Sequence, residues 1–180
     1  MDTSVHSNFH ALGLSEAILQ DLAAAGFSSP TPIQEQAIPP ALAGRDVIGC
    51  AQTGTGKTAA FVIPMVERLA ALPKGQPQAL ILAPTRELAL QTLTTIEKLG
   101  RSRRISATVI VGGADMQAQV RGLRQRPEIL VATPGRLLDH MWSGNILLSS
   151  IKMLVLDEAD RMLDMGFAPQ INQILDALPE

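Results

Sequence analysis

The chain has 180 residues, about the length of one globular domain. Hydrophobic residues make up 46% of it and charged residues 18%, which supplies enough apolar material for a core and excludes a disordered segment. The net charge is −2, so any contact with nucleic acid must come from a local patch. The single cysteine, Cys50, excludes an intrachain disulfide.

The sequence predicts neither a secretory signal nor a membrane-spanning helix. Residues 1–8 lack the basic region and following apolar run of a secretory signal. No apolar run approaches the roughly 18 residues that a membrane-spanning helix needs. We therefore expect a cytoplasmic protein with no membrane partner.

Strand-like and helical patterns alternate along the chain. An early helix should begin after the N-cap Ser15 and end at Gly26. Five short apolar runs are typical of parallel strands that are covered on both faces. These runs are residues 46–50, 79–83, 107–111, 128–132 and 152–156.

Helical spacing between these runs completes the pattern. Apolar residues form one stripe over 88–99, closed by Gly100, and another over 171–178, with Pro169 near its first turn. The alternation predicts an open α/β fold with a mainly parallel sheet flanked by helices. Ligands in such sheets bind at the carboxyl ends of the strands, so the residues that follow each strand are the candidate sites.

A glycine-rich loop follows the first apolar run and precedes a helical stretch. It consists of Ala51, Gln52, Thr53, Gly54, Thr55, Gly56, Lys57 and Thr58. Small residues let successive backbone N–H groups turn toward phosphate oxygens, and the helix N-terminus adds its positive dipole end. Lys57 would reach the β and γ phosphates, and the Thr58 hydroxyl would bind Mg²⁺. A glycine-rich turn without a ligand is the weaker alternative, because Gly-Lys-Thr stands between a strand and a helix.

Two carboxylates, Asp157 and Glu158, follow directly on the apolar run 152–156. Acidic side chains at the end of a buried strand are costly unless they are paired or lie near a metal. Asp157 would hold Mg²⁺ directly or through water, and Glu158 would orient the attacking water. Capping of a helix by Asp157 or Asp160 does not explain two adjacent acids. With the glycine-rich loop, the pair predicts a nucleotide triphosphatase whose catalytic residues are Lys57, Asp157 and Glu158.

The glycine-rich loop and the sequence Asp157-Glu158-Ala159-Asp160 resemble those of the DEAD-box ATP-dependent RNA helicases. The similarity runs in the family's order from Phe9 to about Phe167. It implies a RecA-like (P-loop NTPase) domain over residues 36–180, preceded by a segment over 1–35 that contains the adenine-reading Q motif. It also implies that ATP is the cofactor and RNA the partner, with hydrolysis coupled to local duplex unwinding or RNA–protein remodelling.

The Q motif is the part of this resemblance that concerns the base. Gln34 would specify adenine, because a glutamine amide donates and accepts at once. Phe27 would offer a flat face on which the base stacks, with filling of the core as its alternative role. Thr31 and Phe9 belong to the same implied nucleotide-binding set, although Phe9 could equally be a packing residue.

Three further motifs each follow an apolar run and resemble the RNA-contacting motifs of the family's first domain. They comprise Pro84, Thr85, Arg86, Gly112, Gly113, Thr133, Pro134, Gly135 and Arg136. Their positions place hydroxyls, helix N-termini and arginines along one sheet edge, which suits a sugar–phosphate backbone. They contain no base-reading set, so RNA binding should not depend on sequence. Taken alone, the threonines would be better explained as helix caps and the arginines as surface charges.

Several other residues have a simpler interpretation. The arginine-rich stretch from Arg101 to Arg126 is better explained as a solvated face than as a second RNA surface. The histidines lack metal-ligand spacing. Cys50 is expected to be a small core residue at the end of its strand, and Trp142 is expected to pack on a helix.

The resemblance also implies parts that do not occur in these 180 residues. In the family a second RecA-like domain supplies arginine fingers, worth roughly 10³ to 10⁵ in hydrolysis rate. We therefore expect the chain alone to bind nucleotide with little or no hydrolysis. A Ser-Ala-Thr strand would lie between the P-loop strand and the acidic-box strand, so both neighbours should expose an edge. The sequence leaves open whether rearrangement, a swapped partner or further chain fills this gap.

Two other functions stay open. A DNA-directed translocase would share the phosphate loop, and recognition of the 2′-OH would separate RNA from DNA. A non-catalytic binding module would keep the loop as a structural relic. Its nucleotide binding would be insensitive to Lys57→Ala.

Overall fold

The computed structural model describes residues 8–180, so the stretch considered above for a secretory signal lies almost wholly outside the described residues. The described chain divides into two compact units. The first contains the residues up to Leu72 together with Thr95–Ile105, and the second contains Pro73–Thr94 together with Ser106–Glu180. Each unit contains residues that the sequence assigned to binding or catalysis.

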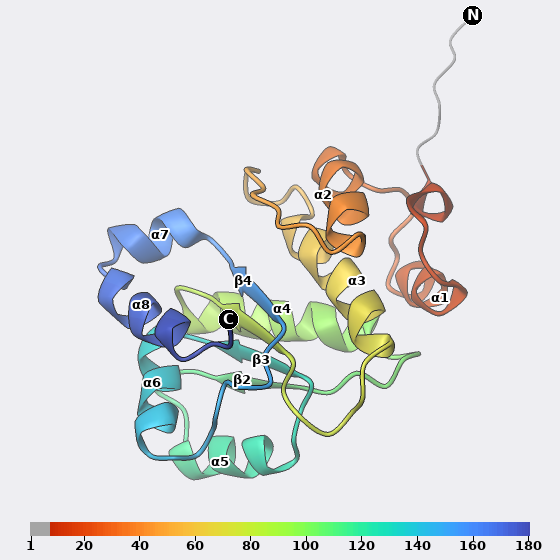
Figure 1. Cartoon of the computed structure of the whole chain (residues 1–180). Helices are drawn as coiled ribbons and strands as arrows, with labels where there is room; N and C mark the ends of the chain where they lie inside the picture. Colours follow the sequence, from red (N-terminus) through yellow and green to blue (C-terminus); the bar gives the residue numbers. More distant parts are fainter. Residues whose placement is uncertain (1–7) are drawn as a thin grey trace, which may run out of the picture. The chain divides into compact units, whose positions relative to one another are not determined.

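The first unit is helical. It contains a short 3₁₀ helix, η1 (Phe9–Leu12), and the helices α1 (Glu16–Ala24), α2 (Pro32–Leu42) and α3 (Lys57–Ala70), as Figure 1 shows. The Ser15 hydroxyl accepts from the N–H of Ile18 and donates to Glu67 of α3 at 2.5 Å, so the predicted N-cap also ties α1 to α3. Gly26 adopts a φ of +84° just after α1, which agrees with the predicted helix end.

The second unit contains a four-stranded parallel sheet. The strands are β1 (Ala79–Leu82), β2 (Ala107–Ile110), β3 (Ile129–Ala132) and β4 (Met153–Leu156), in the spatial order β2-β3-β1-β4. Every side chain of β1 and β3 is buried, because both strands have neighbours on each side. Four of the five predicted strands, and the parallel α/β fold, are therefore confirmed.

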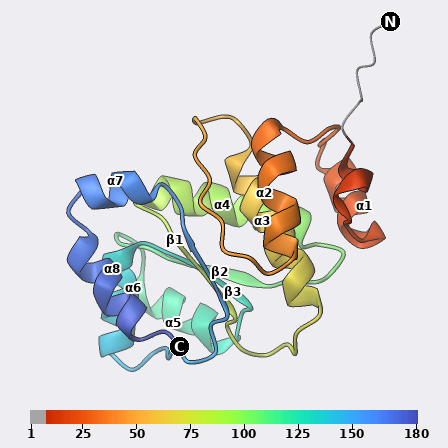
Figure 2. The same cartoon turned by 45° about the horizontal axis from the view of Figure 1, so that its top comes forward.

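Helices connect and follow these strands. They are α4 (Arg86–Leu99), whose last residues belong to the first unit, α5 (Met116–Arg124), α6 (Pro134–Trp142), α7 (Ala159–Asp164) and α8 (Ala168–Asp176). Helices α6 and α8 pack together, and both views show them side by side (Figures 1 and 2). Leu80, Leu130, Leu137 and Ile174 belong to the core that joins these helices to the sheet.

The prediction of a strand over residues 46–50 is wrong. The segment between α2 and α3 is irregular, and Figure 1 draws it as a loop. Ile48 is 96% exposed, and none of the strands that the structure describes pairs with this segment. A strand needs a hydrogen-bonding neighbour, and without one an apolar run has no reason to remain extended and buried. Cys50 is consequently exposed and is not the core residue expected from the sequence.

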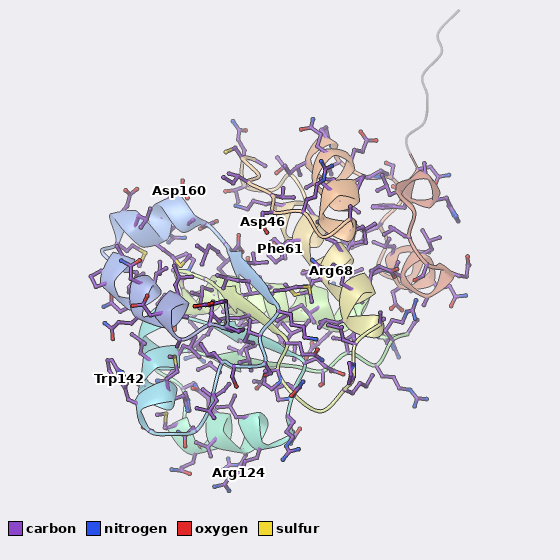
Figure 3. All side chains as sticks on the ribbon, in the orientation of Figure 1. Asp46, Phe61, Arg68, Arg124, Trp142 and Asp160 are labelled. Atoms are coloured by element: carbon purple, nitrogen blue, oxygen red, sulfur yellow. The ribbon has the colours of Figure 1, made fainter. Side chains whose placement is uncertain are left out.

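Trp142 is a second correction. It ends α6 with 70% of its surface exposed, and Figure 3 shows the side chain directed outward from the helix. The buried face of α6 is formed instead by Leu137, Leu138 and His140. The expectation that Trp142 packs is therefore wrong. In the part of the chain that the structure describes, no helix has the length and apolar character to cross a membrane.

Candidate functional site

The phosphate loop of the first unit ends at the start of α3. Gly56 is the N-cap of this helix with a φ of +78°, and Lys57 is its first residue. Gly54 also has a positive φ, +83°, and a Cβ added there would meet no atom within 4 Å. The hydroxyl of Thr55 donates to the carbonyl of Gln52 at 2.6 Å, which closes the turn. A glycine cap has no side chain to occupy the first N–H groups of α3, so these groups suit an anion.

Gln34 links the Q motif to this loop. Its Oε1 accepts from the N–H of Thr31 at 3.0 Å, and its Nε2 donates to the carbonyl of Gly56 at 3.0 Å. The side chain is buried, and a Cβ at Gly56 would lie 2.4 Å from Nε2. One bond uses one of the two oxygen lone pairs and the other uses one of the two N–H groups, which leaves one of each for a further partner. The glutamine predicted to read adenine therefore also holds the turn predicted to hold phosphate.

The two aromatic residues of the Q-motif region contact each other. The rings of Phe9 and Phe27 have centroids 6.4 Å apart and an interplanar angle of 73°, an edge-to-face pair. Phe9 is buried, whereas Phe27 is only half-buried. Phe27 thus retains surface on which a base can stack, while its ring also contacts Phe9.

In the second unit, the three motifs predicted to contact RNA follow adjacent strands. The strand order places the ends of β2, β3 and β1 side by side. The N–H of Ala83 donates to the carbonyl of Ala132 at 2.9 Å, and the N–H of Thr133 donates to the carbonyl of Ile110 at 3.0 Å. The hydrogen bonds between neighbouring strands therefore continue up to the first residues of the motifs. The Thr85 hydroxyl accepts from Leu88 at 3.3 Å and therefore does cap α4. The structure thus gathers the three motifs at one sheet edge.

Two arginines from different motifs hold the loop after β2. Arg86 donates to the carbonyl of Gly113 at 3.5 Å, and Arg136 donates to the carbonyl of Ala114 at 3.0 Å. Arg136 also lies 3.6 Å from the Asp139 carboxylate. Gly112, Gly113, Arg86 and Gly135 remain exposed, whereas Pro84, which lies two residues before α4, and Pro134, the first residue of α6, are buried. The arginines thus organise the surface to which they were assigned.

The acidic pair lies at the end of β4 in the second unit. The N–H of Asp157 donates to Leu82 at 2.9 Å, and the side chain is buried. Glu158 precedes α7 with a φ of +51°, a conformation that costs free energy for any residue except glycine. Arg161 lies 3.3 Å from the Glu158 carboxylate. The Glu158 side chain makes no capping hydrogen bond to α7, and Arg104 and Arg126 share its left-handed conformation.

One set of polar residues was missed by the sequence reasoning. Gln119 and His140 are buried on the inner faces of α5 and α6 and contact each other. The available signal was helical spacing: Gln119 lies one turn from the buried Leu123, and His140 one turn from Leu137. Among residues 8–180, no group of three or more His, Cys, Asp or Glu side chains is arranged to hold a metal ion.

Comparison with known proteins identifies relatives along almost the whole chain. The family model described as DEAD/DEAH box helicase matches residues 31–180. The chain is 48% identical over 182 residues to the ATP-dependent RNA helicase DRS1 of Coccidioides immitis, which covers 99% of the chain and 22% of that relative. It is 49% identical over 172 residues to the ATP-dependent RNA helicase CshA of Limosilactobacillus reuteri, with coverages of 96% and 34%.

A third relative gives the same result. The ATP-dependent rRNA helicase RRP3 of Pyricularia oryzae is 53% identical over 174 residues, which cover 96% of the chain and 32% of the relative. The chain thus spans about a third of the length of this relative, or less in the case of DRS1. The matched region contains the phosphate loop, the acidic pair and the three loops at the sheet edge. The chain belongs to the DEAD/DEAH box helicase family.

Proposed function

We propose that this chain is the nucleotide-binding domain of an ATP-dependent RNA helicase. In the intact enzyme it would act with a second RecA-like domain and couple ATP hydrolysis to local RNA unwinding or RNA–protein remodelling. The observation that carries the proposal is the hydrogen bond from Gln34 to the carbonyl of Gly56. It joins, within one compact unit, the residue assigned to adenine and the turn assigned to phosphate.

The residues of the first unit fit ATP. The uncapped N–H groups at the start of α3 and the Lys57 ammonium would bind the phosphates. The unused N–H and lone pair of Gln34 would pair with the adenine edge, which guanine would mismatch. Phe27 would stack on the base. Gly54 leaves open space where a side chain would otherwise stand, as a phosphate cradle requires.

The residues that would act on the phosphate come from different parts of the sequence: Thr58 belongs to the first unit, and Asp157 and Glu158 belong to the second. A bound Mg²⁺ would neutralise phosphate charge, and the Thr58 hydroxyl and Asp157 carboxylate are the hard oxygen ligands that this ion prefers. Glu158 would orient and polarise the attacking water. Because arginine fingers would come from the second domain, we expect little or no hydrolysis from the 180 residues alone. A robust RNA-stimulated ATPase rate from this chain would contradict that expectation.

RNA would bind to the loops after β1, β2 and β3. Exposed backbone groups of Gly112, Gly113 and Gly135 can reach a sugar–phosphate chain, and no side chains there form a base-reading set. The binding should therefore depend little on sequence. If the protein contacts the 2′-OH groups, an oligouridine should bind more tightly than the oligodeoxyuridine of the same length. Equal affinity would favour a DNA-directed translocase.

Calorimetric titration with ADP and GDP tests the nucleotide site. We expect ADP to bind at least tenfold more tightly than GDP, and Gln34→Ala to abolish the preference. Gln36→Ala is the matched control, because Gln36 is an exposed glutamine on the same helix. Gln34→Glu keeps the acceptor for Thr31 but replaces the N–H donor to Gly56 by a charged oxygen, so it is a second test of the donor if the alanine variant folds poorly.

The same titration with Lys57→Ala separates enzyme from binding module. Loss of ADP affinity supports a working phosphate loop. Equal binding of ADP and GDP by the wild-type chain would overturn the adenine assignment. Affinity that is unaffected by Lys57→Ala would overturn the phosphate assignment and favour a non-catalytic module.

A further inference from the structure

A chain of buried hydrogen bonds connects α6 to the loop after β2. The Nε2 atom of His140 lies 2.8 Å from Oε1 of Gln119, and Nε2 of Gln119 donates to the carbonyl of Val111 at 2.7 Å. On the other side of the ring, Nδ1 of His140 lies 3.1 Å from Nδ2 of Asn145. His140, Gln119 and Val111 are all buried. None of the functional assignments above uses this chain of bonds.

The donors and acceptors fix the state of the histidine ring. The amide nitrogen of Gln119 donates to Val111, so the atom that faces His140 is the amide oxygen. This oxygen can only accept a hydrogen bond from the ring. Nε2 of His140 therefore carries the proton. Nδ1 is then the acceptor for the Asn145 amide, as in a neutral imidazole. One tautomer of neutral His140 thus satisfies every bond in the series.

Burial and charge favour the same neutral state. Desolvation lowers the pKa of His140 below its ordinary value of 6.5, and the nearby Arg136 guanidinium lowers it further. The Asp139 carboxylate opposes both effects. The ring therefore remains a fixed donor and acceptor at neutral pH.

The atoms that this network holds belong to the RNA-facing loop. Val111 immediately precedes Gly112 and Gly113, and the carbonyls of Gly113 and Ala114, two and three residues further on, accept hydrogen bonds from Arg86 and Arg136. Three carbonyls in four residues are thus turned toward the protein. In a planar trans peptide the N–H of the following residue points opposite to the carbonyl. Fixing these carbonyls therefore turns the N–H groups of Gly112, Ala114 and Asp115 away from the groups that hold the loop.

We propose that His140 is a positioning residue for RNA binding, which acts through Gln119 and Val111 to aim backbone N–H groups of the Gly112–Gly113 loop at a phosphate. The inference rests on the proposed function, because RNA is its ligand. Gly112 and Gly113 are exposed, so a phosphate can reach their peptide groups. Gly113 has a φ of +73°, which lets successive N–H groups turn toward one side. The histidine itself touches no RNA.

Two variants separate positioning from stability. His140→Phe removes the donor and leaves the Gln119 oxygen buried without a partner, which is destabilising. The double variant Gln119→Leu/His140→Phe removes the orphaned Gln119 oxygen and its cost, but it also removes the bond to Val111, so it should regain only part of that stability. In the single variant Gln119 can still donate to the Val111 carbonyl, whereas the double variant leaves that carbonyl without its side-chain donor. His10→Phe is the matched control, because His10 is an exposed histidine of the first unit.

The measurement is the anisotropy of a fluorescein-labelled oligouridine titrated with each protein at low salt. We expect the double variant to fold but to bind roughly three- to tenfold more weakly, about the worth of one hydrogen bond. His10→Phe should bind as the wild type does. Amide spectra of the double variant should show the largest shift at Gly112, whose N–H shares a peptide with the Val111 carbonyl, with the amides of Gly54 and Gly56 unchanged.

The possible failures are distinguishable. Wild-type protein that binds no RNA would overturn the proposed function, and the role of His140 with it. Wild-type binding that the stable double variant retains in full would overturn the positioning role alone. Weaker binding with an unshifted Gly112 amide would also overturn it, because the loop would then not be the mediator.

Discussion

Residues 46–50 and strand β1 are both short apolar runs, yet only β1 is a strand. Ile81 of β1 is fully buried and its strand pairs with β3 on one side and β4 on the other. Ile48 is almost fully exposed, in a segment that pairs with none of the described strands. The two isoleucines have the same intrinsic preference for extended structure. The difference shows that hydrogen-bonding neighbours, and not composition alone, decide which apolar run becomes a strand.

The strongest test replaces the isoleucine in each region by alanine. Ile81→Ala should lower the free energy of unfolding by about 2 to 5 kcal/mol, because it opens a cavity in the sheet core. Ile48→Ala should change it by less than about 0.5 kcal/mol, because its side chain is already in water. Urea denaturation followed by circular dichroism measures both. Similar losses for the two variants would mean that residues 46–50 are buried in solution.

The loop that follows residues 46–50 is ordered by other means, and two glycines show how. Gly54→Ala meets no nearby atom and should cost about 1 to 2 kcal/mol, for the left-handed conformation alone. Gly56→Ala carries the same conformational cost and also places its Cβ 2.4 Å from Nε2 of Gln34. It should therefore be the more destabilising of the two, and should weaken ADP binding more. Equal effects would show that the contact between Gln34 and Gly56 does not order the loop.

The sequence predicted most of the second unit and less of the first. Strand β1 was predictable because its own sequence is continuously apolar, and the two strands that pair with it are apolar runs as well. The fate of residues 46–50 was not, because pairing is a long-range property that a local pattern does not contain. The acidic pair was found because two carboxylates after an apolar run are chemically conspicuous. His140 was missed because a buried polar residue is recognised by its partners, and Gln119 lies 21 positions away.

The pH dependence of stability provides a smaller test, which reports on the second unit. Because the folded pKa of His140 lies below 6.5, the unfolded chain takes up this proton first as the pH falls. The contribution of neutral His140 to the free energy of unfolding is thus complete above pH 6.5. It is lost as the pH falls below 6.5, by at most about 1.4 kcal/mol per pH unit. Urea denaturation at a series of pH values below 6.5 should show this decline in the free energy of unfolding for both the wild type and His10→Phe. Gln119→Leu/His140→Phe should lack it, and a slope retained there would assign the effect to another group.

The smallest effect on folding is expected from Ile48→Lys. This variant tests whether the unpaired run 46–50 causes the protein to self-associate. β4 pairs with β1 alone among the described strands, and Leu156 and Ile48 are both exposed. Unpaired edges and exposed apolar runs favour self-association, and lysine opposes it. Sedimentation velocity should show wild-type protein associating as its concentration rises, and Ile48→Lys associating less, with folding changed by no more than about 0.5 kcal/mol. Leu147→Lys removes an exposed leucine from the second unit and serves as the control. If Leu147→Lys alone abolished association, the apolar surface before β4, and not the unpaired run 46–50, would be responsible.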